Sequence, residues 1–161
     1  MIRLTQINWN NAGPFSRLEV NENQKEEMFD FKHVLGMLYC KWVSSGVQPL
    51  IYGIAYGDTT AVGVIAVNYE TVEEGHYINN DTKIYNVWSL WIDKEHQGKG
   101  YGKVAMEEMI KLLRSMPNRM ADCVYLSYEA ENEAARRLYK SLGFVDTGDD
   151  DCGSVVARLI L

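Results

Sequence analysis

The stretch HQGKGYGKVAMEEM, residues 96–109, places three glycines within five positions directly before a run of good helix formers. Glycines let the backbone turn sharply, so that consecutive N–H groups point inward. The helix that follows adds the positive end of its dipole, and Lys99 and Lys103 add positive charge. We therefore expect a phosphate here, although a plain turn between a strand and a helix explains the glycines alone equally well.

Two well-known phosphate motifs do not fit this turn. The Walker loop needs GxxxxGK followed by Ser or Thr, but the run that starts at Gly98 is one residue too short and has Val104 at the hydroxyl position. The dinucleotide fingerprint GxGxxG has a third glycine where this chain has Lys103. Both interpretations are therefore weakened.

A third pattern, Q/R-x-x-G-x-G/A, is met by Gln97, Gly100 and Gly102. A second motif follows about 30 residues downstream, where ENEAARRLYKSLGF, residues 131–144, contains N-x-x-A-x-x-L-Y-x-x-x-G-F. With both motifs in this order, the chain resembles the GNAT superfamily of N-acetyltransferases. The resemblance is firm over residues 88–144 and looser over the rest of the chain.

The resemblance implies a fold class that the residue pattern also favours, because strand-like and helix-like periods alternate along the chain. We expect an α/β chain with a single GNAT domain over residues 1–161. Its mixed central sheet should have about six or seven strands, be splayed at its centre and be flanked by about four helices. Strands are expected at 3–7, 50–56, 61–70, 83–93, 123–129, 144–148 and 154–161, helices at 14–20, 31–43, 100–115 and after Asn132, and loops at 71–82 and 149–151.

The resemblance implies acetyl-CoA as co-substrate. The pyrophosphate of acetyl-CoA would lie on the backbone of the turn, and the pantetheine arm would pair with the preceding strand like an added strand. A bulge in that strand would leave a main-chain N–H free for the thioester oxygen. The cofactor-binding residues predicted in this way are Leu90, Trp91, Ile92, Gln97, Gly98, Lys99, Gly100, Tyr101, Gly102, Lys103 and Asn132.

Two residues of the second motif match residues with roles in the family. Asn132 matches an asparagine that contacts the cofactor, although a plain helix N-cap explains it as well. Tyr139 matches the tyrosine that faces the sulfur and can protonate the departing thiolate as a general acid. Without the surrounding motif, Tyr139 would be interpreted as a core tyrosine on an apolar helix stripe.

The resemblance leaves the general base open. A free alkyl amine has a pKa of about 10 and arrives protonated. Many family members carry a carboxylate on the strand before the turn, where this chain has Asn86, Trp88 and Ser89. Glu129, after the fifth strand, is our candidate for the catalytic base, and a water chain to solvent is the alternative. His96 is expected to be a surface residue beside the turn.

Composition and charge argue against several classes of protein. The chain has 161 residues, a net charge of −6 and a pI of 5.1, whereas a nucleic-acid-binding protein needs a basic face. No stretch approaches the length of a membrane span, and the N-terminus lacks the apolar core of a signal peptide. The three cysteines and three histidines show no CxxC or metal-ligand spacing. We therefore expect a reduced, cytoplasmic protein with no metal, nucleic-acid or membrane partner.

Acidic residues gather in residues 18–31, which loosely resemble the same region of bacterial spermine/spermidine-type acetyltransferases. A carboxylate-lined mouth would attract a polyamine or another small cationic amine, whereas ordinary solvated faces explain each cluster alone. The alternatives are a GNAT enzyme for a protein amine or an aminoglycoside, and a non-catalytic acetyl-CoA-binding regulatory module. A homodimer is one assembly that the sequence leaves open. The acidic clusters are Glu19, Glu22, Glu26, Glu27 and Asp30; Glu70, Glu73 and Glu74; and Asp149, Asp150 and Asp151.

Overall fold

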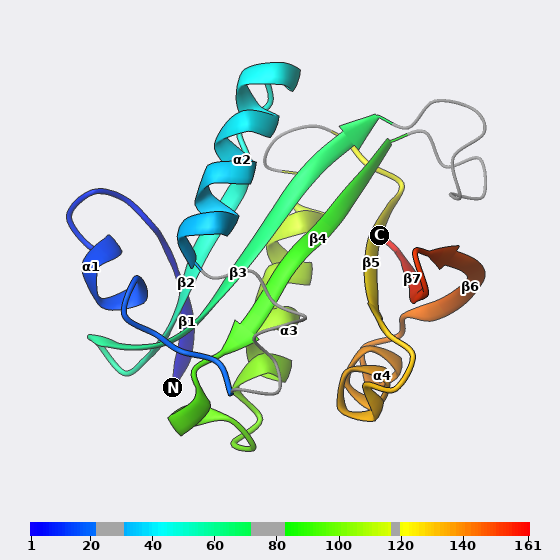
Figure 1. The fold of residues 1–161 in the computed structure, drawn as a ribbon. Helices are drawn as coiled ribbons and strands as arrows, with labels where there is room; N and C mark the ends of the chain where they lie inside the picture. Colours follow the sequence, from blue (N-terminus) through cyan, green and yellow to red (C-terminus); the bar gives the residue numbers. More distant parts are fainter. Residues whose placement is uncertain (22–30, 72–82, 117–119) are drawn as a thin grey trace. The chain divides into compact units, whose positions relative to one another are not determined.

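The computed structural model describes residues 1–21, 31–71, 83–116 and 120–161. Seven strands form one sheet in the order β1-β2-β3-β4-β5-β7-β6 (Figure 1). The sheet is mixed, because β4 and β5 run parallel while β1–β2, β2–β3, β5–β7 and β6–β7 run antiparallel. This open α/β sheet, with four α-helices among the described residues, confirms the predicted fold class. Contacts along the chain define two units, 1–67 with 89–110 and 68–88 with 111–161, and each is described by itself.

The first unit begins with three antiparallel strands, β1 (Ile2–Gln6), β2 (Leu50–Tyr56) and β3 (Thr60–Thr71), the last of which continues into the second unit. β1 begins one residue earlier than predicted, and β2 and β3 form the predicted hairpin. Residues on both faces of β3 are buried, so that the strand is covered on both sides.

The first helix is much shorter than predicted. α1 covers only Ala12–Phe15, so the predicted helix at 14–20 is wrong. The main chain after α1 bonds to another part of the unit instead. The Glu19 N–H donates to the Asp93 carboxylate at 2.9 Å, and the Glu19 carbonyl accepts from the Lys94 N–H at 2.8 Å. Because both main-chain groups of Glu19 are used in this way, the helical hydrogen bonds do not continue.

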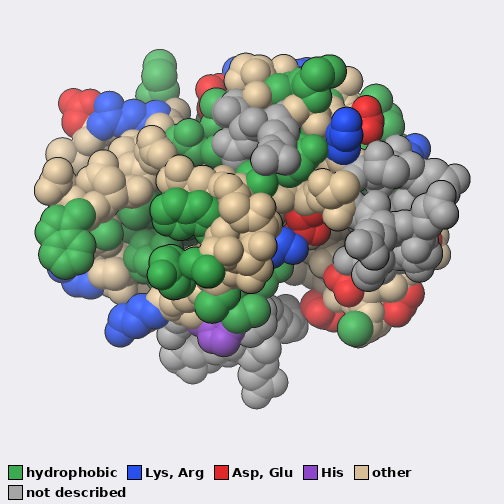
Figure 2. All heavy atoms as spheres, turned by 90° about the horizontal axis from the view of Figure 1, so that it is seen from above, with side chains coloured by type: hydrophobic (Ala, Val, Ile, Leu, Met, Phe, Trp, Pro, Cys, Tyr) green, Lys and Arg blue, Asp and Glu red, His purple; other side chains and the backbone are tan. Residues whose placement is uncertain are grey.

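α2 (Phe31–Ser45) confirms the helix predicted at 31–43. Phe31, Val34 and Leu38 are buried on one face, at the spacing of an amphipathic helix. The residues after Leu38 are all exposed. Figure 2 shows hydrophobic side chains at the surface among charged ones. The large hydrophobic residues exposed on α2 are Met37, Tyr39, Trp42 and Val43.

β4 (Lys83–Ile92) and α3 (Tyr101–Arg114) flank the glycine-rich turn as predicted, and both continue from one unit into the other. The apolar stripe of α3 is buried, since Met106, Met109 and Leu113 have no exposed surface. This burial confirms the helical period of the sequence. The predicted polar loop at 71–82 lies almost entirely outside the described residues.

The second unit contains β5 (Cys123–Glu129), α4 (Glu133–Ser141), β6 (Val145–Asp151) and β7 (Ser154–Ile160). β5 pairs in parallel with the start of β4 and antiparallel with β7. β6 forms the edge of the sheet beside β7. A buried cluster in this unit consists of Ile84, Cys123, Tyr125 and Val156.

β6 is longer than the strand predicted at 144–148. The predicted loop at 149–151 is wrong, because these residues belong to β6. The register shifts between Asp146 and Asp150, after which Asp150 pairs with Val155. A bulge of this kind takes up extra residues and lets the pairing resume.

Candidate active site

The glycine turn, which we define as residues 97–103, connects β4 to α3 after a 3₁₀ turn at Lys94–His96. Gly98 and Gly100 have φ angles of 73° and 76°, in the left-handed region that favours glycine. A Cβ atom at either glycine would meet no heavy atom of the described residues within 4 Å. α3 begins directly after Gly100, and the N–H groups of its first turn have no carbonyl partners within the helix. The turn therefore offers the N–H donors and the open space that an anion needs.

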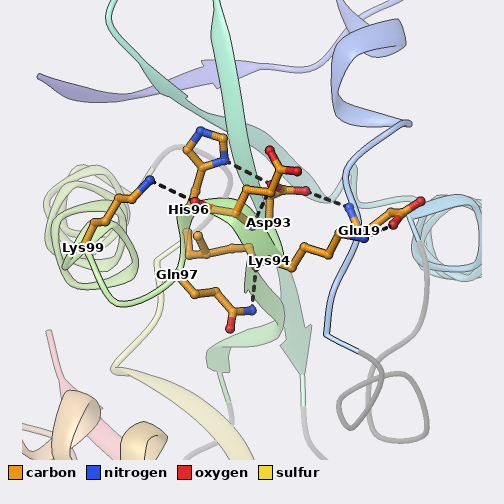
Figure 3. A network of polar contacts seen from close by, with 8 residues as sticks. Glu19, Asp93, Lys94, His96, Gln97 and Lys99 are labelled. Atoms are coloured by element: carbon orange, nitrogen blue, oxygen red, sulfur yellow. Dashed lines mark hydrogen bonds and ion pairs between the residues drawn. The ribbon is translucent and has the colours of Figure 1, made fainter.

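Gly102 and the two lysines take different parts in the turn. Gly102 lies outside the left-handed region, and a Cβ atom there would lie 3.7 Å from Ile92 Cγ1, an ordinary van der Waals contact. Lys99 folds back and donates to the Glu95 carbonyl at 2.9 Å (Figure 3). Lys103 is exposed and has no polar partner among the described residues. Lys103 is therefore the predicted cation that stays available to an anion.

Asp93 anchors the turn, and sequence reasoning missed its part. Its carboxylate accepts from the Glu19 N–H at 2.9 Å and the Glu95 N–H at 3.2 Å, and lies 3.1 Å from His96 Nδ1 (Figure 3). Burial alone would raise the pKa of this carboxyl group, but the hydrogen bonds from Glu19, His96 and Glu95 together lower it below its usual value. Asp93 is therefore ionised at neutral pH. The available signal was the place of Asp93 as the N-cap of the 3₁₀ turn.

His96 lies beside the turn, as predicted, and is half-buried. Its side chain is only 26% exposed, with Nδ1 against Asp93. Its ring centroid lies 6.5 Å from that of Tyr101, and Tyr101 stacks in turn on Tyr56 with centroids 5.5 Å apart. The capping carboxylate and the aromatic neighbour together cover part of the imidazole. The sequence around His96 contains no pattern that predicts its contact with Asp93 or with Tyr101.

The side chain of Gln97 fastens the glycine turn to the strand before it. Gln97 Nε2 donates to the Ile92 carbonyl at 3.0 Å, and Gln97 Oε1 accepts from Asn21 Nδ2 at 2.7 Å. An amide can donate and accept at once, which suits it to this bridging position. The predicted residue Gln97 therefore supports the turn through its side chain, while its backbone role toward a phosphate stays a prediction.

The predicted pantetheine strand presents two different faces. Trp91 is 5% exposed and packs in a cluster with Phe15, Phe31 and Val64, so its side chain belongs to the core. Its indole Nε1 is buried without a hydrogen-bond partner among the described residues. Ile92 faces the other way, toward Gly102, as the alternation of a strand requires. Any contact of Trp91 with a cofactor would therefore come from its main chain.

In the second unit, Tyr139 lies on α4 and is 9% exposed. Its ring packs against those of Tyr128 and Phe144, with centroids 5.6 Å and 5.7 Å away. Burial, with a smaller effect of Tyr128, raises the pKa of Tyr139 to about 12. The Tyr139 hydroxyl has no hydrogen-bond partner among the described residues, whereas the Tyr128 hydroxyl donates to Asp146 at 2.9 Å. Tyr139 is therefore a core tyrosine that also keeps an uncommitted donor.

Asn132 and Glu129 are neighbours in the second unit. Asn132 Oδ1 accepts from the Ala135 N–H at 3.0 Å, which confirms its N-cap role and leaves Nδ2 without a partner among the described residues. The Asn132 N–H donates to the Glu129 carbonyl at 2.9 Å. The Glu129 side chain is exposed and accepts from the Ser154 hydroxyl at 3.2 Å. The second unit thus brings Glu129 and Asn132 together, while the predicted turn and strand residues form a set within the first unit.

A glycine turn between β4 and α3, followed by a capped α4 that carries Tyr139, is the order of elements expected from the two motifs. A model of the acetyltransferase (GNAT) family matches residues 10–144. The chain belongs to this family. GNAT enzymes use acetyl-CoA as co-substrate, in agreement with the predicted cofactor.

Relatives and solved structures are similar to different degrees. N-alpha-acetyltransferase RimI of Mycobacterium tuberculosis is 33% identical over 64 residues, which are 40% of this chain and 37% of that protein. A probable spermine N(1)-acetyltransferase of Bacillus subtilis subsp. natto is 36% identical over 75 residues, 45% of this chain and 48% of that protein. The matches thus span less than half the length of these relatives. The PaiA N-acetyltransferase of Thermoplasma acidophilum, solved with coenzyme A, shares the fold, with a TM-score of 0.66, 14% identity and coverage of 100% of this chain and 99% of that one.

Two further observations concern the part of the chain that the structure describes. No helix there is long and apolar enough to cross a membrane. No group of three or more His, Cys, Asp or Glu side chains there is placed to hold a metal ion. The family match leaves both ends of the chain outside, so a single domain over residues 1–161 stays a prediction.

Proposed function

We propose that the protein transfers the acetyl group of acetyl-CoA to a primary amine. The observation that carries this proposal is the open, left-handed backbone at Gly98 and Gly100, next to the N-terminus of α3, in a chain of the GNAT family. Acetyl-CoA supplies an activated thioester when bound. The N–H groups of the glycine turn suit its pyrophosphate, and Lys103 adds a positive charge.

The reaction forms one C–N bond and breaks one C–S bond. The neutral amine attacks the thioester carbon, and the electron pair of the C–S bond leaves with the sulfur. Nitrogen must lose one proton and sulfur must gain one, so the chain has to move two protons in the right order. We assign proton removal to Glu129 or to a water chain, and proton delivery to Tyr139.

The raised pKa of Tyr139 constrains how it acts as the general acid. A pKa of about 12 lies above that of an ordinary thiol, which is about 8.5, so proton transfer from Tyr139 alone would be uphill. The transfer becomes favourable when Glu129 or the water chain passes the proton that it takes from nitrogen on to Tyr139, which restores the Tyr139 hydroxyl. Tyr139 therefore acts as a general acid whose proton is replaced from the acceptor side, and its uncommitted hydroxyl supports this role.

For the acceptor, we favour a small cationic amine such as a polyamine. The match to a probable spermine acetyltransferase and the net charge of −6 support this choice. Glu19 adds little attraction, because it is paired with Lys94 at 2.5 Å. The second candidate is a protein α-amine, which the match to RimI favours. Four of the other acidic residues expected near the acceptor, Glu22, Glu26, Glu27 and Asp30, lie outside the described residues.

Release of the free thiol of coenzyme A across a panel of amines tests the proposed function. We expect turnover with spermidine to exceed turnover with a peptide that has a free N-terminus. The reaction without amine serves as the blank. Turnover with the peptide but not with spermidine would show that the acceptor is a protein amine and not a polyamine. Binding of coenzyme A without turnover on any amine would contradict the proposed acetyltransferase activity and favour a non-catalytic binding module.

A further inference from the structure

Two segments of the first unit that are far apart in the sequence meet beside the glycine turn. Residues 18–21 follow α1, and residues 93–97 follow β4 (Figure 3). The main chain of Glu19 bonds to the second segment twice, with its N–H donating to the Asp93 side-chain Oδ1 at 2.9 Å and its carbonyl accepting from the Lys94 N–H at 2.8 Å. Side chains add two contacts, Lys94 Nζ to Glu19 Oε2 at 2.5 Å and Asn21 Nδ2 to Gln97 Oε1 at 2.7 Å.

Asp93 accepts the first of these bonds and makes further contacts on its own side. One carboxylate oxygen accepts from the Glu19 N–H, and the other faces both the Glu95 N–H and His96 Nδ1. Asp93 is 8% exposed, so water competes little for these bonds. The Asp93 N–H donates to the Val62 carbonyl on β3 at 2.8 Å, which fixes the residue to the sheet. Asp93 therefore connects β3 through its main chain, and connects residues 18–21 and the 3₁₀ turn through its carboxylate.

The glycine turn depends on support of this kind. Gly98 and Gly100 bring no side chains that could pack, and ordering one residue costs about 1–2 kcal/mol of conformational entropy. His96 lies between the carboxylate and Tyr101, which is the first residue of α3. The contacts at both ends of His96 pass the position of Asp93 on to the N-terminus of that helix.

We propose that Asp93 is a positioning residue that couples residues 18–21 to the conformation of the glycine turn. This inference rests on the proposed function, since coenzyme A is taken as the ligand of the turn. Coupling between two sites is reciprocal. Coenzyme A at the turn therefore orders residues 18–21, and loss of the bond between Glu19 and Asp93 weakens the binding of coenzyme A.

The first test replaces the carboxylate itself. Asp93→Asn keeps the size of the side chain and one acceptor oxygen, but its NH₂ group cannot accept from Glu95 or His96. Calorimetric titration should show coenzyme A binding weakened roughly 10- to 100-fold, the scale of hydrogen bonds to a charged group. His96→Asn keeps a donor for Asp93, whereas His96→Phe keeps only the ring. The proposal expects His96→Phe to lose more affinity than His96→Asn.

A second pair of variants leaves the buried carboxylate in place. Glu19→Pro removes the N–H that donates to Asp93, while Glu19→Gln keeps that N–H and removes the charge that pairs with Lys94. We expect Glu19→Pro to weaken coenzyme A binding clearly more than Glu19→Gln. These variants test the coupling even where Asp93→Asn does not fold.

Amide hydrogen exchange supplies a readout that a merely structural role would not move. Coenzyme A should slow exchange at the Glu19 amide in the parent protein and fail to do so in Asp93→Asn. Leu38→Ala is the control, because it opens a cavity in the core of the same unit, away from these contacts. This variant should lose stability and keep the effect of coenzyme A on the Glu19 amide.

The outcomes separate the inference from the proposed function. If the parent binds coenzyme A, and Asp93→Asn and Glu19→Pro bind it equally well, the coupling is absent. The same conclusion holds if Leu38→Ala weakens binding as much as Asp93→Asn does, because general instability then explains the loss. If the parent does not bind coenzyme A at all, the proposed function fails and the coupling falls with it.

Discussion

Tyr139 and Tyr128 have ring centroids 5.6 Å apart, but only the Tyr128 hydroxyl has a hydrogen-bond partner among the described residues, donating to Asp146. This difference makes the two tyrosines a matched pair. Tyr139→Phe keeps the ring and removes the proton donor, so kcat should fall roughly 10²–10⁴-fold while coenzyme A affinity changes little. Tyr128→Phe should keep kcat close to that of the parent. Parent turnover in Tyr139→Phe would leave Tyr139 a core residue only.

Burial of Tyr139 also predicts how stability responds to alkali. The pKa is raised to about 12 from a usual value of about 10, so the folded protein holds the phenol proton more tightly than the unfolded chain. The protonated Tyr139 phenol therefore contributes at most about 3 kcal/mol to the free energy of unfolding. This contribution is fully present below about pH 10 and is lost as the pH rises through about 12. Urea unfolding at about pH 9 and about pH 11.5 should show that the free energy of unfolding falls less with this rise in pH in Tyr139→Phe than in the parent. An equal loss would contradict this burial.

Single residues of the candidate site were predictable where a local motif carries them. Asn132 is one example, because the cap bond reaches only to Ala135. Asp93 and His96 were not predictable in the same way. The bond between Asp93 and Glu19 joins residues 74 positions apart, and local spacing contains no information about such a contact.

Among the elements, β4, the glycine turn and α3 form a strand–turn–helix motif in which the glycines are not equivalent. Gly100 has a φ of 76° and open space beside it, whereas Gly102 is outside the left-handed region and would place a methyl group in ordinary contact with Ile92. Gly100→Ala should therefore weaken coenzyme A binding roughly 5- to 100-fold, because it strains the backbone and fills the anion space. Gly102→Ala should lose much less affinity for coenzyme A. Equal affinities in a calorimetric titration of both variants would count against the glycine turn as the phosphate site.

Helices and strands with a sustained apolar pattern were predictable from the sequence. The ends of elements that depend on hydrogen bonds to distant residues were not. The apolar stripe of α3 and the run of β5 gave the right element and nearly the right bounds. α1 ends early because Glu19 bonds to the segment after β4, and β6 continues because a bulge lets its pairing with β7 resume. Neither cause has a local signature in the chain.

At the scale of the whole molecule, the net charge of −6 predicts attraction for a cationic acceptor. kcat/KM for spermidine should fall steeply as salt rises, since exposed charges are screened beyond about 8–10 Å at physiological ionic strength. Replacing Glu22, Glu26 and Glu27 together by Gln should raise KM for spermidine and leave KM for acetyl-CoA nearly unchanged. Parent-like acetylation of spermidine by the triple variant would make this cluster an ordinary solvated face.

We infer that the glycine turn binds the pyrophosphate of acetyl-CoA. Titration of nitrogen-15-labelled protein with coenzyme A, followed through the backbone amide shifts, tests it most directly. We predict that the largest shift changes fall on the amides of residues 98–103, because these N–H groups would bond to the phosphates. Saturable binding of coenzyme A with unchanged amide shifts at residues 98–103 would contradict binding of the pyrophosphate at the glycine turn.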